Sequence, residues 1–206
     1  LSATTYLSPL RRAKEAIDNA EKAMRVARDG PAYHQSNLGW AYFYGGQLKS
    51  AIAAWNESLK LFPGSFSPTY GLSCALGELG EWEQCEDLLA KLAATYREQA
   101  EIVALQAYYQ AKKGDREMAE SYAQAVLNPL KRGYRPALCK ALARLALSLG
   151  RPGGVNSKEY EQAFRLLEEA FQEGDIRLRW LAVNPVFGEF KKHLRYARLV
   201  HSLGLA

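Results

Sequence analysis

Hydrophobic residues recur along this chain at the spacing of one face of an α-helix. In one stretch they stand at positions i, i+3, i+4, i+7 and i+11, as Leu48, Ala51, Ile52, Trp55 and Leu59. A later stretch has a similar spacing at Trp82, Cys85, Leu88, Leu89 and Leu92. Each set places its apolar side chains on one side of a helix. Because no β-rich stretch is found anywhere, the pattern predicts an all-α protein.

The hydrophobic pattern also predicts a helical hairpin that repeats every 34 residues. Gly46, Gly80 and Gly114 stand at this constant spacing, and five positions later come the small residues Ala51, Cys85 and Ala119. A second apolar-periodic stretch of about fourteen residues precedes each glycine. Because glycine tolerates left-handed backbone at a helix C-terminus, we place the hairpin turns at these glycines. Gly150, with Leu142 and Ala143 before it, repeats the upstream half.

The two ends of the chain are predicted to cap this repeat array as parts of one domain, residues 1–206. Stacked repeats need end pieces because an unpaired repeat leaves an apolar face in water. A lone helix is predicted over Ser8–Arg28, with Ser8 as its cap and Pro9 in its first turn. The loop Arg151–Lys158 is expanded and rich in turn formers. We therefore place an N-terminal cap at 1–30, repeats at 31–64, 65–98, 99–134 and 135–175, and a basic C-terminal cap at 176–206.

The 34-residue period is that of the tetratricopeptide repeat. The first unit resembles the signature of that family at Leu38, Gly39, Tyr42, Ala51, Trp55 and Pro63. It departs from the signature where Gln35 replaces the usual tryptophan and Ser58 a usual alanine. The resemblance implies a right-handed superhelix of about four helical hairpins with capping helices. It also implies a non-enzymatic protein-interaction module.

The two ends of the chain resemble one group of bacterial tetratricopeptide regions. The opening residues Tyr6-Leu7-Ser8-Pro9 and the closing residues 180–187, Trp-Leu-Ala-Val-Asn-Pro-Val-Phe, carry this resemblance. In that group the region is the C-terminal part of a signalling protein. The upstream part is a winged-helix regulator, a nucleotide cyclase or a protein kinase. The resemblance therefore implies a sensing or docking role, and because the chain begins with Leu1 we expect it to be a piece of a longer protein.

Composition excludes several other classes. Hydrophobic residues make up 48% and charged residues 24% of the chain, so we expect a folded protein and not a disordered one. The longest uncharged runs are broken by glycine, proline, serine and asparagine, so no membrane span and no membrane insertion is expected. The chain opens without a secretory signal. The cysteines number three and form no CxxC pair, so we expect buried thiols at Cys74, Cys85 and Cys139.

Motifs for catalysis are not found in the sequence. It contains no GxxxxGK[ST], GxGxxG, HExxH or GxSxG. His34, His193 and His201 are too few and too scattered for a metal cluster. The sequence therefore predicts a protein that is not an enzyme and needs no cofactor or metal.

A partner-binding groove is the main functional candidate. By analogy with the tetratricopeptide fold, the first helix of each unit lines a concave groove. The residues predicted to line it are aromatic at one end and basic at the other: Tyr33, Trp40, Phe43, Tyr44, Tyr70, Tyr108, Lys140 and Arg144. Tryptophan and tyrosine suit interfaces because they bury a large area and keep a polar group. The alternative is that these aromatics pack between repeats.

One class of partner is excluded by the residues of this face. Tetratricopeptide domains that bind the carboxylate tail of chaperones present lysine and asparagine on this face. Here the matching positions hold Ser36, Trp40, Gly71, Glu101 and Leu105, so a chaperone tail is not the expected partner.

Positive charge is concentrated in the C-terminal cap. Residues 176–206 contain six basic residues and one acid, Glu189, which accounts for the whole net charge of +5. The basic residues are Arg177, Arg179, Lys191, Lys192, Arg195 and Arg198, and Lys131, Arg132 and Arg135 are candidates to join them. Such a cluster can attract an acidic protein, a neighbouring domain or a nucleic-acid backbone, or can remain a solvated face. Nucleic acid is the weaker candidate because no recognition helix or aromatic-interleaved groove is present.

The expected partner is a protein, a peptide or another domain of the same parent protein. A scaffold that binds anionic partners through the basic cap is the alternative, and a self-assembling adaptor is a third interpretation. The oligomeric state stays open. The cytoplasm is the favoured compartment, and the periplasm fits a membrane-tethered regulator.

Overall fold

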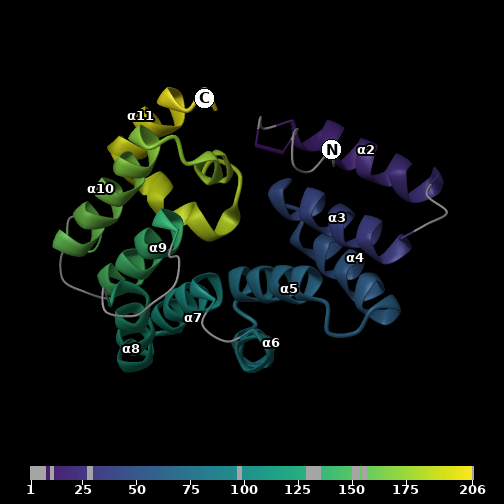
Figure 1. Cartoon of the computed structure of the whole chain (residues 1–206), viewed down its shortest axis with the longest axis horizontal. Coiled ribbons are helices and arrows are strands. Elements are labelled where there is room, and N and C mark those ends of the chain that lie inside the picture. Colours follow the sequence, from purple (N-terminus) through teal and green to yellow (C-terminus); the bar gives the residue numbers. More distant parts are fainter. Residues whose placement is uncertain are drawn as a thin grey trace. The chain divides into compact units, whose positions relative to one another are not determined.

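The computed structural model describes residues 8–9, 12–26, 30–96, 99–128, 136–149, 154 and 157–205. Within these ranges the chain consists of helices joined by turns and contains no strand, which confirms the predicted all-α class (Figure 1). The described residues form two compact units. Those of the first fall within Leu1–Leu88, Arg179–Gly188 and Leu205, and those of the second within Leu89–Leu178 and Glu189–Gly204.

The first unit is built from antiparallel helical hairpins. Its helices are α2 (Ala13–Val26), α3 (Pro31–Tyr44), α4 (Leu48–Leu61) and α5 (Phe66–Leu79), and α6 (Trp82–Thr95) begins in it. Helix α3 packs against α2 on one side and α4 on the other, and α4 packs against α5. Small side chains make the α2 contact close, because its core consists of Ala16, Ile17, Ala20, Leu38, Ala41 and Ala54.

The second unit begins with α-helices arranged as hairpins and continues with two short 3₁₀-helices and a last α-helix. Its α-helices are α7 (Ala100–Lys113), α8 (Arg116–Leu127), α9 (Ala137–Ser148), α10 (Lys158–Gln172) and α11 (Leu194–Ser202). Two 3₁₀-helices, η2 (Ile176–Trp180) and η3 (Pro185–Lys192), lie between α10 and α11. Each 3₁₀-helix has one end in each unit.

The predicted turn glycines close the hairpins. Gly80 and Gly114 have left-handed backbone, with φ of 81° and 97°. The amide after each glycine donates to a carbonyl five residues back: Glu81 to Leu76 and Asp115 to Gln110, both at 2.9 Å. This pattern satisfies the last carbonyls of the helix and turns the chain. The hairpin turns predicted at these positions are confirmed.

The start of the N-terminal helix differs from the prediction. Ser8 and Pro9 lie in a turn, and α2 begins at Ala13 instead of after Ser8. Within the described residues, the Ser8 hydroxyl has no hydrogen-bond partner, so it does not cap this helix. Elsewhere serine and aspartate do cap helices, because Asp115 accepts from the Met118 amide and Ser157 from the Tyr160 amide.

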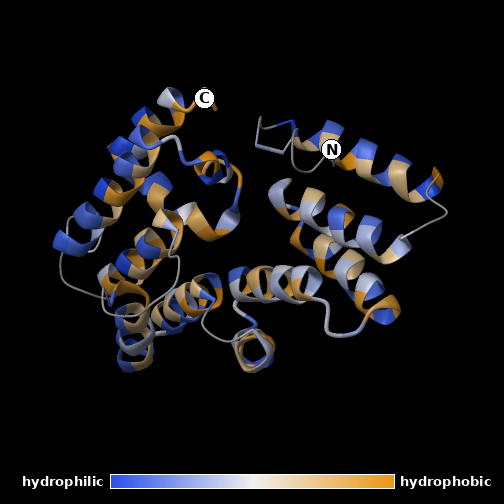
Figure 2. Ribbon diagram, in the orientation of Figure 1, coloured by the Kyte–Doolittle hydropathy of each residue, from blue (hydrophilic) through white to orange (hydrophobic). Residues whose placement is uncertain are grey.

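The described helices bury apolar side chains along one face. In α10 the buried residues are Tyr160, Ala163, Phe164, Leu167 and Ala170, and the opposite face is charged (Figure 2). In the C-terminal part, Phe187, Phe190 and Leu199 are buried, whereas Leu194 is 85% exposed at the start of α11. Every described helix is too short or too polar to span a bilayer.

Candidate partner-binding site

One tryptophan sets the distance between the two helices that carry the predicted aromatic residues. Trp55, on α4, is fully buried, and its indole lies against Gly39 of α3 and Gly71 of α5. A Cβ atom at either glycine would lie 2.4 Å from the ring. The Trp55 indole N–H donates to the Ser36 carbonyl at 3.1 Å. The glycines therefore let one large side chain fill the space between the helices, and α3 and α5 present neighbouring faces.

These faces bring together three of the predicted groove residues. Trp40 and Tyr44, on α3, stack with their ring centroids 5.5 Å apart and 23° between their planes. Tyr70, on α5, has its ring centroid 6.4 Å from that of Trp40. All three side chains are partly exposed. We refer to Trp40, Tyr44 and Tyr70 as the aromatic face.

Polar contacts hold the aromatic face in one orientation. The Trp40 indole N–H donates to the Ser67 hydroxyl at 2.9 Å, and the hydroxyls of Ser36 and Ser67 share a hydrogen bond of 3.0 Å. Behind the face, Trp55 lies edge-on to Trp40, with their centroids 5.0 Å apart. Burial raises the pKa of the Tyr44 hydroxyl, so this residue stays neutral at physiological pH. The face is therefore preformed and uncharged.

A tryptophan from the far end of the chain also contacts the aromatic face. The Trp180 ring stacks on Tyr44, with their centroids 4.6 Å apart and 24° between their planes. The Arg179 guanidinium lies 5.6 Å from the centroid of the Trp180 ring. Sequence reasoning identified Trp180 only as part of the closing motif. Helical periodicity could not link it to Tyr44, because the two residues are far apart in the sequence.

The other predicted groove residues of the first unit lie differently. Tyr33 is 63% exposed and contacts His34 edge-on. Phe43 is fully buried, with its ring 5.8 Å from Trp55, so it packs between helices and contributes no contact surface. This is a correction to its predicted place in the groove. Phe43 stands three positions after Trp40 on α3 and therefore points in a slightly different direction around the helix, which carries it into the core.

In the second unit the predicted groove residues are likewise divided. Tyr108 is 1% exposed and is therefore a core residue rather than a surface anchor. The Lys112 ammonium lies 5.3 Å from its ring centroid. Arg144 forms an ion pair with Glu159 at 2.7 Å, and Lys140 is partly exposed.

Half of the predicted basic patch forms ion pairs, mostly with acidic residues from outside the C-terminal cap. Arg177 pairs with Asp175 at 2.7 Å, Lys192 with Glu189 at 2.7 Å, and Arg195 with Glu161 and Glu168. Arg179 lies against Trp180, and Lys191 and Arg198 are exposed. Lys131, Arg132 and Arg135 lie outside the described residues.

The three thiols are free and buried, as expected. Burial raises the pKa of Cys85 to about 12, and burial also raises the pKa values of Cys74 and Cys139 above the ordinary thiol value. Thiolates are the reactive form, so these thiols are poor nucleophiles. The described part of the chain contains no group of three or more acidic, histidine or cysteine residues placed to hold a metal ion.

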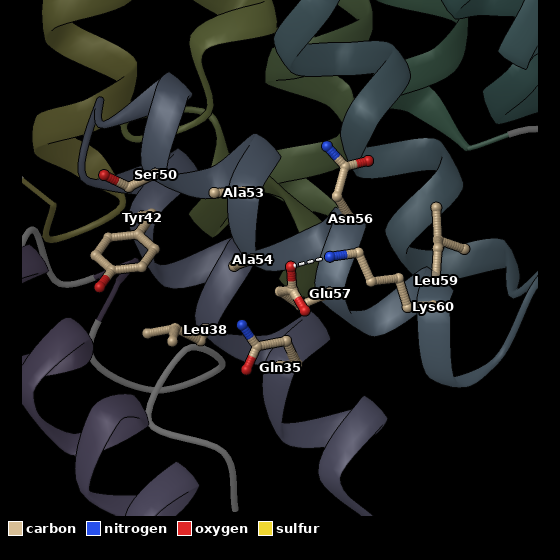
Figure 3. A pocket seen from close by; sticks show the side chains of 10 residues that line it. All are labelled: Gln35, Leu38, Tyr42, Ser50, Ala53, Ala54, Asn56, Glu57, Leu59 and Lys60. Atoms are coloured by element: carbon tan, nitrogen blue, oxygen red, sulfur yellow. Dashed lines mark hydrogen bonds and ion pairs between the residues drawn. The ribbon is translucent and has the colours of Figure 1, made fainter.

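A separate open hollow of about 900 Å³ lies on α3 and α4. Its walls include Leu38, Tyr42 and Ala54, and the Glu57–Lys60 ion pair, 2.6 Å long, lies at one side (Figure 3). The Tyr42 hydroxyl donates to Glu21 of α2 at 2.8 Å. This hollow contains none of the residues of the aromatic face.

Comparisons with known proteins place the fold. No family model matches the chain, and no curated protein matches its sequence. Its structure is similar to the crystal structure, at 2.39 Å resolution, of a tetratricopeptide repeat protein from Parabacteroides merdae ATCC 43184. The TM-score is 0.53 at 15% sequence identity, over 97% of this chain and 75% of that one. The fold is that of the tetratricopeptide-repeat proteins. The fold predicted from the 34-residue period is confirmed.

Proposed function

We propose that this tetratricopeptide protein is a non-enzymatic interaction module that binds a peptide or protein partner through the aromatic face of its first unit. The observation that carries the proposal is the combination of order and exposure at Trp40, Tyr44 and Tyr70. All three rings remain partly exposed although they contact one another. Tetratricopeptide folds commonly serve as scaffolds for protein partners, which agrees with this function.

The physical basis of binding is burial of large, rigid side chains. Tryptophan and tyrosine lose few rotatable bonds on binding, and they dominate the free energy of many interfaces. The hydrogen bond from Trp40 to Ser67 fixes the ring before the partner arrives. Because the face is ordered in advance, little side-chain entropy is lost when a partner binds.

The resemblance of the two chain ends suggests the setting of this module. We propose that it is the sensor or docking part of a larger bacterial signalling protein. In that setting the partner is either a separate protein or another domain of the same chain. Tyr33 and Lys140, both accessible, are candidates for additional contacts.

Capture of partners from a lysate of the source organism tests the proposal. The variant combines Tyr44→Ala with Tyr70→Ala and leaves Trp40 in place, because Trp40 also packs on Trp55. Tyr122→Ala is the matched control, since Tyr122 is a partly exposed tyrosine on α8 of the second unit. We expect one protein to be retained by the wild type and the control and lost by the double variant, with circular dichroism verifying that all three are folded. Equal capture by all three would contradict the proposal.

The same capture at two salt concentrations tests the anionic-partner alternative. Binding through the exposed bases Lys191 and Arg198 would weaken steeply between about 50 and 200 mM salt. Binding through the uncharged aromatic face is expected to change little. A partner that is lost at high salt but insensitive to the double variant would indicate the basic cap as the binding surface.

A further inference from the structure

We propose that the aromatic face is a binding site for a tryptophan side chain. The chain's own Trp180 occupies this tryptophan site until a tryptophan of a partner displaces Trp180. This inference rests on the proposed function and specifies the partner. The expected ligand is a peptide that carries a tryptophan preceded by a basic residue, as the chain's own segment does at Arg179 and Trp180.

The stacking geometry indicates which kind of side chain the tryptophan site binds. Trp180 and Trp40 both stack on Tyr44, at interplanar angles of 24° and 23°. Nearly parallel rings at centroid distances of 4.6 and 5.5 Å are the offset arrangement that aromatic pairs favour. The site therefore selects a flat, wide ring, and indole is the ring that the protein itself places there.

The segment that carries Trp180 is held in the way a docked peptide is held. Arg179–Gly188 belongs to the first unit, although the rest of that unit, apart from Leu205, ends at Leu88. Leu181 is fully buried, and Val186 and Phe187 are 3% and 6% exposed. The segment lies at the junction of two short 3₁₀-helices, which have weak hydrogen-bond geometry. Its order therefore depends on the surface that it contacts.

The Arg179 side chain indicates that the chain's own segment does not satisfy every polar group at this site. Its guanidinium lies over the Trp180 ring, 5.6 Å from the centroid, and this cation–π contact favours a base beside the tryptophan. Yet its buried Nε atom has no hydrogen-bond partner among the described residues. An unsatisfied buried donor is costly, so a partner peptide that pairs its base with an acceptor gains an advantage over the chain's own segment.

The test uses the full chain and a synthetic peptide of residues 176–188, Ile-Arg-Leu-Arg-Trp-Leu-Ala-Val-Asn-Pro-Val-Phe-Gly. Peptide binding is measured by calorimetry for the wild type, Trp180→Ala, and Trp82→Ala as the matched loss of an indole elsewhere. In the wild type the tethered Trp180 competes at high effective concentration. We therefore expect the peptide to bind Trp180→Ala at least about tenfold more tightly than the wild type or Trp82→Ala.

Two further binding measurements test whether the peptide binds at the tryptophan site. A peptide with its tryptophan replaced by alanine is expected to bind Trp180→Ala weakly, and the double variant Trp180→Ala/Tyr44→Ala is expected to lose the intact peptide. Equal affinity for the wild type and Trp180→Ala, or no binding to a Trp180→Ala chain that is folded by circular dichroism, would overturn the inference. If the inference failed in this way, loss of the captured partner in the Tyr44→Ala/Tyr70→Ala variant would still support the proposed function. Failure of the inference can therefore be distinguished from failure of the proposed function.

A measurement on the intact wild type keeps the inference testable if Trp180→Ala does not fold. The chain is labelled with 5-fluorotryptophan, and the Trp180 resonance is assigned from Trp180→Phe. Excess peptide is expected to move the Trp180 fluorine signal to the position of an exposed indole and to leave the Trp82 signal in place. A Trp180 signal that does not respond to saturating peptide would overturn the inference.

Discussion

At the scale of single residues, two glycines and one tryptophan position the aromatic face. Trp55 occupies the space that side chains at Gly39 and Gly71 would need. The small residue at position 39 was expected from the repeat signature, and its role as a close-approach position is visible in the structure. For Gly71, by contrast, the sequence indicates only that this position lacks a chaperone-binding side chain.

The packing of Trp55 against Gly71 leads to a stability prediction. In Gly71→Ala the new Cβ atom would lie 2.4 Å from the Trp55 ring, so α4 or α5 has to shift. We expect the free energy of unfolding to fall by about 1–3 kcal/mol, as for other overpacked cores. Urea denaturation monitored by circular dichroism measures the change. Gly188→Ala is the control, because no heavy atom lies within 4 Å of its added Cβ atom; equal stability losses in both variants would contradict this account.

A second residue-scale prediction concerns acid stability. Asp175 accepts a hydrogen bond from the Arg177 guanidinium at 2.7 Å, and this bond lowers the pKa of the Asp175 carboxyl. The pKa of an aspartate in an unfolded chain is about 3.9. The contribution of ionised Asp175 to the stability of the folded state is therefore complete above that pH, and it is lost as the pH falls through the lower pKa of the folded state. We expect Asp175→Asn to be less stable than the wild type at neutral pH. The gap in urea midpoint should close between about pH 5 and pH 2; a gap independent of pH would show that the charge of Asp175 contributes nothing.

At the scale of elements, one arginine links α11 to α10. Arg195 donates through Nε to Glu168 at 2.9 Å and also pairs with Glu161, and its guanidinium lies 5.5 Å from the Phe164 ring centroid. The sequence predicted Arg195 as part of a free basic patch. It could not reveal the acidic partners, because Glu161 and Glu168 stand on a helix far from Arg195 in the sequence.

Replacing this arginine by lysine tests whether the linkage depends on geometry or only on charge. Arg195→Lys keeps the positive charge but loses the planar fork that serves two carboxylates. We expect the free energy of unfolding to fall by about 1 kcal/mol, because both glutamates remain partly exposed. The exposed Arg198→Lys is the matched control and is expected to leave the urea midpoint unchanged. Wild-type stability in Arg195→Lys would mean that the ion pairs do not hold α11.

The hairpins themselves were predictable from the sequence, whereas the burial or exposure of individual aromatic residues was not. Glycines 34 residues apart fixed the turns, since only a few residue types tolerate their backbone. Phe43 and Tyr108 share the helix pattern of Trp40 and Tyr44, yet they are buried. Burial depends on which neighbouring helix covers a residue, and the period of a single helix does not contain that information.

At the scale of the whole molecule, the chain uses one of its late segments to complete an early unit. The segment Arg179–Gly188 belongs to the first unit, with Trp180 against Tyr44. No repeat or periodicity connects these residues, so a contact over this sequence distance could not be predicted. The position of Trp180 nevertheless changes the functional interpretation, because the aromatic face is partly covered by the protein's own chain.

The proposed function requires that a partner protein contacts the aromatic face. Site-specific photo-crosslinking tests it most directly: p-benzoylphenylalanine replaces Tyr70 in one sample and Tyr122 in another, each is irradiated with the captured partner, and the products are identified by mass spectrometry. Both positions are partly exposed tyrosines, so their intrinsic reactivity is comparable. We expect a partner adduct from position 70 and none from position 122. Adducts from position 122 alone would contradict the proposed function.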